Sequence, residues 1–185
     1  MEVIRKRGRS VSYRINADIL DAVIKEARLR KITPNILVNN VLRRFIEFEK
    51  YRENLEIMPV PKKLLVDLME AADDRMIKHF AEKTFRILNN AVIFMRKQQD
   101  LESFLYVLKL YLEVSVISFD HTVSGSMHTI ALRHDMGLKW SEFAKELISI
   151  ICEKLVGKRA DFELTDCCLI ATMELPEGID KQLIA

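Results

Sequence analysis

Histidine and cysteine side chains gather in the second half of the chain, where their types suggest metal chemistry. Three histidines lie within fourteen residues, and three cysteines follow downstream: His121, His128, His134, Cys152, Cys167 and Cys168. Imidazole and thiolate together suit Zn, Ni or Cu. Their spacing matches no recognised metal motif, and the adjacent Cys167 and Cys168 do not form a spaced disulfide framework. We therefore expect no bound metal or other cofactor, and keep the three histidines as candidate ligands of a metal-responsive protein.

The sequence shows none of the motifs of the common enzyme classes that we sought. It contains no Gly-rich phosphate loop, no paired zinc motif and no nucleophile-elbow sequence. A Cys–His pair would require the fold to bring His134 beside a thiol. The stretch HDMGLKWS, residues 134–141, is the most distinctive one in this half. A tight connection into a helix explains it, with Asp135 as a cap, Gly137 for backbone freedom and Trp140 as a core anchor. We expect that the protein is not an enzyme.

The start of the chain combines positive charge with strand-like alternation. Residues 1–50 hold 12 Lys and Arg against 6 Asp and Glu, a net of +6, and the remaining residues have a net of −4. The excess of positive charge at the start of the chain suggests that this region binds a polyanion. Residues 10–15 alternate polar and apolar types with the period of a β-strand, and Val11, Tyr13 and Ile15 share one face. This predicted strand has no hairpin partner nearby.

Two helices are predicted directly after this strand. Asn16 is a suitable N-cap, and apolar residues recur at helical spacing as far as Ala27, so the first helix should end near Arg30-Lys31. Thr33 and Pro34 suit the N-cap and first position of a second helix. Its apolar stripe consists of Leu37, Val38, Val41, Leu42, Phe45 and Ile46. One strand and two short helices bury too little apolar surface alone, so we expect two copies to associate through paired strands and packed helices.

Residues 8–48 resemble a ribbon-helix-helix DNA-binding domain of the Arc/MetJ type. The resemblance is carried by the alternating strand that ends in Arg14-Ile15, the cap at Asn16, the start Thr33-Pro34-Asn35 and the run LVNNVLRRF at residues 37–45. The family often has a glycine between the two helices, where this chain has Lys31-Ile32.

This resemblance implies an antiparallel β-ribbon in the major groove and gives each face a role. The dimer core would consist of Val11, Tyr13, Ile15, Leu37 and Val41. Ser10, Ser12 and Arg14 would face the base edges, where Arg can bridge guanine O6 and N7. Backbone N–H groups of Thr33, Asn35 and Ile36 at the start of the second helix would suit a phosphate. The predicted phosphate contacts are Arg5, Lys6, Arg7, Arg9, Thr33 and Asn35.

The rest of the chain predicts a second domain of mixed helix and strand. Met58-Pro59-Val60-Pro61 breaks any continuing helix, so we place a linker at 51–62, between a domain at 1–50 and a C-terminal domain at 63–185. Helices are predicted at about 62–72, 74–97 and 100–114. A strand at 127–133, a helix carrying Trp140 and a strand at 162–175 then form either a βαβ unit or one layer of an α+β domain.

The predicted fold class is therefore α+β and mainly helical, with a ribbon-helix-helix start and a C-terminal α/β domain that contains a strand-helix-strand unit. The predicted function is that of a homodimeric transcriptional regulator that binds double-stranded DNA, with a tetramer as the larger assembly. The C-terminal domain should extend oligomerisation or respond to an effector. The alternatives are an antitoxin-like protein-interaction module and a metal-responsive regulator.

The expected location is the cytoplasm, with no membrane partner. No run approaches the ~18 apolar residues that a membrane-spanning helix needs. The basic start is not followed by the apolar stretch of a secretory signal sequence.

Overall fold

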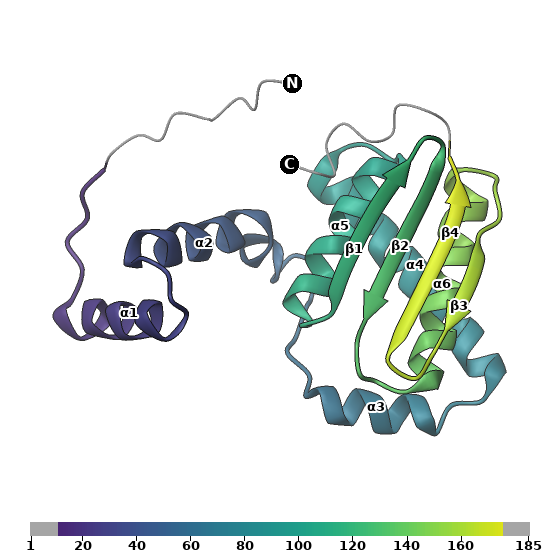
Figure 1. Cartoon of the computed structure of the whole chain (residues 1–185), viewed down its shortest axis with the longest axis horizontal. Helices are drawn as coiled ribbons and strands as arrows, with labels where there is room; N and C mark the ends of the chain where they lie inside the picture. The colour runs from purple at the N-terminus through teal and green to yellow at the C-terminus, as the bar shows by residue number, and fades with distance from the viewer. Residues whose placement is uncertain (1–10, 176–185) are drawn as a thin grey trace. The chain divides into compact units, whose positions relative to one another are not determined.

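The computed structural model describes residues 11–175, and the chain divides into two compact units between Lys50 and Tyr51. We call the unit Met1–Lys50 the head and the unit Tyr51–Ala185 the body, and describe each by itself (Figure 1). The described head is helical, and the body combines helices with an antiparallel sheet. The predicted class, α+β and mainly helical, is confirmed.

Two amphipathic helices form the described head: α1 spans Ala17–Leu29 and α2 spans Pro34–Glu47. Asn16 has the extended conformation of an N-cap, but its side chain makes no capping hydrogen bond. The Thr33 hydroxyl caps α2 by accepting a hydrogen bond from the Ile36 N–H at 3.2 Å. A proline occupies the first position of α2, where its missing N–H costs nothing. Both helices therefore begin where the sequence predicts.

The turn between α1 and α2 ends the first helix without a glycine. Lys31 has φ = +55°, in the left-handed region. The Lys31 N–H donates to the Arg28 carbonyl at 3.1 Å, and the Ile32 N–H donates to the Ala27 carbonyl at 3.0 Å. These two bonds form a Schellman motif, which satisfies carbonyls at the end of the helix. The turn therefore has the usual Schellman geometry without a glycine, and placing the Lys31 side chain in the left-handed region costs conformational free energy.

Four α-helices of the body begin where the sequence offers breakers or caps. They are α3 (Lys62–Glu70), α4 (Asp74–Arg96), α5 (Leu101–Val114) and α6 (Leu138–Leu155). The carboxylates of Asp73 and Asp100 cap α4 and α5 by accepting backbone N–H bonds at 2.8 and 2.7 Å. The predicted helices at 62–72, 74–97 and 100–114 are confirmed within two residues at each end. A short 3-10 helix, η1 (Glu49–Tyr51), lies before them.

Four antiparallel strands form one sheet, in the order β1-β2-β4-β3. β1 (Ser118–Ser124) forms a hairpin with β2 (Met127–Arg133), and β3 (Asp161–Leu164) forms a second hairpin with β4 (Cys168–Glu174). Helix α6 connects the two hairpins in the chain. The middle of the sheet is the antiparallel pair β2–β4, where strands about 40 residues apart in sequence meet.

Three strand predictions need correction. The sequence prediction lacked β1, and it joined β3 and β4 into one strand at 162–175. Between them the chain reverses in a turn where the Thr165 N–H donates to the Cys168 carbonyl at 2.8 Å and the Thr165 hydroxyl accepts the Cys168 N–H at 2.9 Å. The βαβ alternative, and with it an α/β C-terminal domain, is wrong because β2 and β4 are antiparallel. The alternative of one layer in an α+β domain is confirmed.

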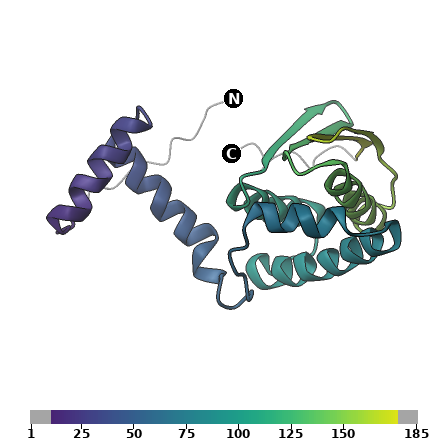
Figure 2. The same cartoon turned by 90° about the horizontal axis from the view of Figure 1, so that it is seen from below.

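Helices cover one face of the sheet, and the core lies between them (Figure 2). Alternate residues of the two central strands are buried, including Ile130, Leu132, Leu169 and Ala171. Helices α5 and α6 contact the strands, and α4 packs against both of these helices. The buried residues of α4 recur at every third or fourth position, as one face of a helix requires: Ile77, Ala81, Phe85, Leu88, Ala91 and Val92. Within residues 11–175, no helix is long and apolar enough to cross a membrane.

An exposed valine in the left-handed region ends α5. Val116 has φ = +59°, although its side chain is 87% exposed. Its N–H donates to the Glu113 carbonyl at 3.2 Å, and the Ile117 N–H donates to the Leu112 carbonyl at 2.9 Å. A second Schellman motif therefore leads into β1, with Ile117 and Leu112 buried in the core. A β-branched residue in this conformation is strained.

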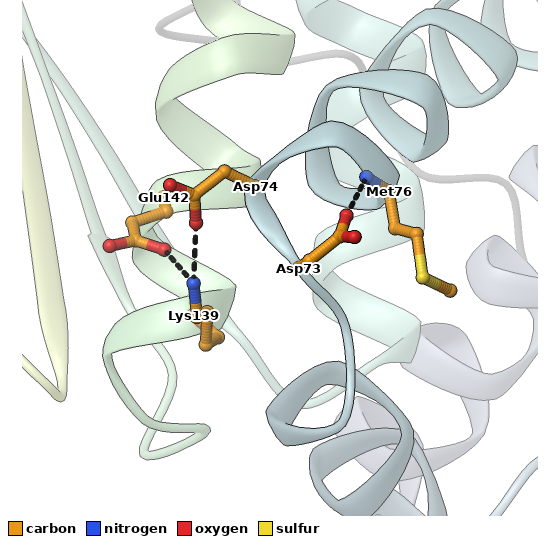
Figure 3. Close-up of polar contacts among 5 residues, drawn as sticks. All are labelled: Asp73, Asp74, Met76, Lys139 and Glu142. Carbon is orange, nitrogen blue, oxygen red and sulfur yellow. Dashed lines mark hydrogen bonds and ion pairs between the residues drawn. The ribbon is translucent and has the colours of Figure 1, made fainter.

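Charged groups connect the first turns of α4 and α6. Lys139 Nζ lies 2.8 Å from Asp74 Oδ1 and 3.1 Å from Glu142 Oε2 (Figure 3). Its hydrogen bonds to these carboxylates raise the pKa of Lys139, and the bond from Lys139 lowers the pKa of Asp74. Because water screens these groups, the ion pairs add little to the stability of the body.

Candidate nucleic-acid interface

The segment that precedes α1 exposes both of its alternating faces. Residues 11–16 have no helix or strand assigned in the single chain. Val11 is 67% exposed and Tyr13 71%, and Ile15 is exposed as well. Ser12 and Arg14, the predicted base contacts in this segment, are also exposed. Val11, Tyr13 and Ile15, the predicted dimer-core residues of this segment, are therefore exposed to solvent in a single copy of the described chain.

The two helices of the head also leave apolar residues in water. The exposed ones on α1 are Ile19, Leu20 and Leu29, and those on α2 are Ile36, Val41, Leu42, Phe45 and Ile46. Val41, a predicted dimer-core residue, is 60% exposed, but Leu37, another one, is only 8% exposed. Leu37 is thus buried within the single chain, together with Ala27 of α1. Exposed apolar residues that recur along both helices mark a candidate interaction surface.

The start of α2 offers fewer backbone donors than the sequence suggested. The Ile36 N–H is taken by the Thr33 hydroxyl, so it is not available to a phosphate. Asn39 donates to both the carbonyl and the side-chain oxygen of Asn35, at 2.8 and 3.2 Å. Because the first N–H groups of a helix have no partner within it, the N–H groups of Thr33 and Asn35 have none within α2. Thr33 and Asn35 are both exposed.

Basic side chains of the described head lie at its surface. Arg14, Lys25, Arg28, Lys31 and Arg43 are exposed. Two further arginines pair with acidic residues, Arg30 with Glu26 at 2.6 Å and Arg44 with Glu49 at 3.4 Å. The remaining predicted contacts, Arg5, Lys6, Arg7, Arg9 and Ser10, lie outside the described residues.

The three candidate histidine ligands separate into a pair and a single residue. His121 Nε2 lies 3.0 Å from His128 Nδ1, on the adjacent strands β1 and β2. His134 follows β2 and makes its contacts elsewhere. Among residues 11–175, no three His, Cys, Asp or Glu side chains are grouped so that they could hold a metal ion.

His134 belongs to a chain of hydrogen bonds that fixes its protonation. Its Nδ1 accepts the Met136 N–H at 3.0 Å, and its Nε2 lies 2.9 Å from the Ser141 hydroxyl oxygen. The Ser141 hydroxyl donates to the Thr165 carbonyl at 2.6 Å, so its oxygen accepts a hydrogen bond from the His134 Nε2–H. His134 is therefore the neutral tautomer with hydrogen on Nε2, and burial lowers its pKa. This serine is held as a donor and is not activated as a nucleophile.

No thiol joins the His134 ring in this network. The Cys152 thiol is buried, donates to the Met173 sulfur at 3.5 Å, and has its pKa raised to about 11 by burial. Cys167 meets His134 through backbone groups, its carbonyl accepting the His134 N–H at 3.0 Å. The sequence pattern of residues 134–141 does not indicate the role of Ser141, because its partner Thr165 lies 24 residues further along the chain. Asp135 was wrongly predicted as the cap of the next helix, because Gly137 holds that position.

The chain matches no model of a known protein family, and no curated protein matches it.

Proposed function

We propose that the protein is a homodimeric, sequence-specific DNA-binding transcriptional regulator. The observation that carries this proposal is the exposed apolar face of the head, made of Val11, Tyr13 and Ile15 with the outer stripes of α1 and α2. A second copy would cover these side chains, as the resemblance to a ribbon-helix-helix domain implies. The gain is substantial, because burying one large apolar side chain contributes about 1.5–3 kcal/mol.

In this proposal the segment at residues 10–15 pairs with its counterpart in the second copy. Antiparallel pairing would turn Val11, Tyr13 and Ile15 toward the four helices and satisfy the strand's open backbone groups. The opposite face, Ser10, Ser12 and Arg14, would then enter the major groove. Arg14 is the main discriminating residue, since its guanidinium can bind guanine O6 and N7 together.

Phosphate contacts in this proposal come from the basic arm and from the start of α2. Arg5, Lys6, Arg7 and Arg9 would add affinity that is independent of sequence and weakened by salt. The Asn35 N–H and the exposed Thr33 suit one phosphate at the α2 N-terminus. The net charge of +6 in residues 1–50, against −4 in the rest, favours DNA contact by the head. Such a protein would act in the cytoplasm.

The first step is to measure the molecular mass of the full chain in solution, which shows whether it is a dimer. Fragments of genomic DNA that bind to the protein are then selected. Affinity is then measured for a selected duplex and for an unrelated duplex. Replacing Arg14→Ala removes one bidentate base contact from each copy, two per dimer, and should weaken binding to the selected duplex by at least about thirtyfold. Binding to unrelated DNA should change much less.

The control variant is Lys25→Ala, which removes an exposed cation of α1 outside the predicted contacts. It should leave the preference for the selected duplex unchanged. An equal loss on both duplexes for Arg14→Ala would make Arg14 a phosphate contact. A monomeric chain that enriches no DNA would refute the proposed function.

A further inference from the structure

Two histidines and a methionine lie on three neighbouring strands of the sheet. His121 of β1 and His128 of β2 face each other, with 3.0 Å between His121 Nε2 and His128 Nδ1. Met173 of β4 is the direct antiparallel partner of His128, and their side chains are buried, at 3% and 1% exposure. The three residues therefore form a row across β1, β2 and β4, which lie side by side in Figure 1. Each of them has an uncharged donor atom that can bind a soft metal ion.

We infer that this row is a copper(I) site, with His121 Nε2, His128 Nδ1 and Met173 Sδ as its ligands. The site belongs to the body alone and goes beyond the DNA binding proposed for the head. Two imidazole nitrogens that each lie about 2.0 Å from one metal ion are about 3.3 Å apart at a tetrahedral angle. The observed separation of 3.0 Å is therefore close to the one that a shared ion requires.

The thioether of Met173 is within reach of the two rings. Residues directly opposite each other in an antiparallel pair have Cβ atoms about 4.5–5.5 Å apart, and methionine has three rotatable bonds to adjust its sulfur. In the structure the Met173 sulfur accepts a hydrogen bond from the Cys152 thiol at 3.5 Å, so it lies in the core and away from water. Binding of copper would exchange this weak contact for a metal–sulfur bond.

The donor set favours copper(I) over the other metals that bind histidine. Among residues 11–175, no third His, Cys, Asp or Glu side chain completes the pair His121 and His128, so the thioether decides the preference. Thioether sulfur selects copper(I), and imidazole binds copper as well. Because the three ligands are neutral and His128 is buried, a monovalent ion costs less desolvation here than a divalent one. The sequence did not indicate this ligand set, because Met173 meets His128 only through the pairing of β2 with β4.

Titration of the full-length chain with copper(I) tests this inference. Copper(I) is kept reduced with ascorbate under anaerobic conditions, and its affinity is measured by competition with a chromophoric chelator. The background carries Cys167→Ser and Cys168→Ser, because two adjacent thiols bind copper(I) themselves. This chain should bind one copper(I) ion, and X-ray absorption should show two nitrogen ligands and one sulfur ligand. Bound copper should also raise the midpoint of thermal unfolding of the body.

Substitutions in the row distinguish the assigned ligands from other sites. His128→Asn and Met173→Leu should each weaken copper(I) binding at least tenfold. Met173→Leu nearly conserves the side-chain volume, so it keeps the test valid if His128→Asn does not fold. The matched control is His79→Asn, at an exposed position of α4, which should leave the affinity unchanged. Circular dichroism shows whether each variant is folded.

Two results would overturn the site. A folded chain that retains no copper(I) against the chelator would refute it. A loss of binding in Cys152→Ser that is absent in Met173→Leu would refute the thioether as the sulfur ligand. Either result would leave the proposed function untouched, because the mass of the chain and the selection of DNA are measured without copper.

Discussion

At the residue scale, His134 shows how hydrogen bonds and burial hold one protonation state. The ring is 2% exposed, and both of its nitrogens already have partners in the neutral form. Burial lowers its pKa below the ordinary 6.5, Asp135 and Asp166 act against this shift, and Lys62 adds to it. A second proton on Nδ1 would break the bond from the Met136 N–H. Protonation of His134 is therefore coupled to opening of the connection into α6.

We predict that the body loses stability as the pH falls below about 6.5. The unfolded chain then binds a proton that folded His134 does not, so the free energy of unfolding falls until the pH passes the folded pKa. This residue lowers the free energy of unfolding by at most about 1.36 kcal/mol for each pH unit. Urea unfolding at several pH values, followed by the fluorescence of Trp140, measures this free energy. The Trp140 ring lies 4.3 Å from that of His134. His134→Gln should flatten the slope, and His79→Gln, at an exposed position of α4, should not.

A second residue-scale prediction concerns Val116. Val116→Gly should stabilise the body by about 0.5–1 kcal/mol, because glycine adopts the left-handed conformation without strain and the exposed side chain contributes no packing. Thermal unfolding measures the change. The control is Val114→Gly, in the last turn of α5, where glycine should destabilise because of its low helix propensity and the loss of a half-buried side chain. If Val116→Gly also destabilises, strain at this position is not significant.

At the element scale, the outer stripe of α2 is the feature that the proposed dimer must cover. Val41→Asp places a charge in the middle of this stripe and should weaken dimerisation at least tenfold, about 1.4 kcal/mol. The neighbouring change Asn40→Asp adds the same charge at an exposed polar position and should leave the dimer intact. Light scattering over a concentration series measures both. A dimer unaffected by Val41→Asp would place the interface elsewhere.

The sequence predicted most elements but not how the strands pair. Helices were predictable because caps such as Thr33 and Asp100 and the spacing of apolar residues are local properties. β1 was missed because its alternate residues are only half-buried at the sheet edge, so its apolar pattern is weak. The β3–β4 reversal was missed because its turn, closed by backbone and side-chain hydrogen bonds of Thr165, lacks the usual glycine. The His134–Ser141–Thr165 chain joins segments distant in sequence, which no local pattern indicates.

At the scale of the whole molecule, the two units should unfold in separate transitions. The body has a core of its own, but the head exposes its apolar stripes in one copy and, in our proposal, needs a second. Raising the protein concentration a hundredfold should therefore raise the midpoint of the head transition by several degrees and leave that of the body unchanged. Calorimetry at several concentrations measures both transitions. Two midpoints that are both independent of concentration would contradict the dimeric head.

The placement of β4 in the middle of the sheet has a consequence for synthesis on the ribosome. β4 pairs with both β2 and β3, yet it ends at Glu174, 124 residues after the head ends at Lys50. At ordinary rates of translation, roughly 6–25 s separate these two points. During this interval the head is complete, but the sheet lacks the strand that joins its two hairpins. The order of translation therefore makes the head available before the body can close.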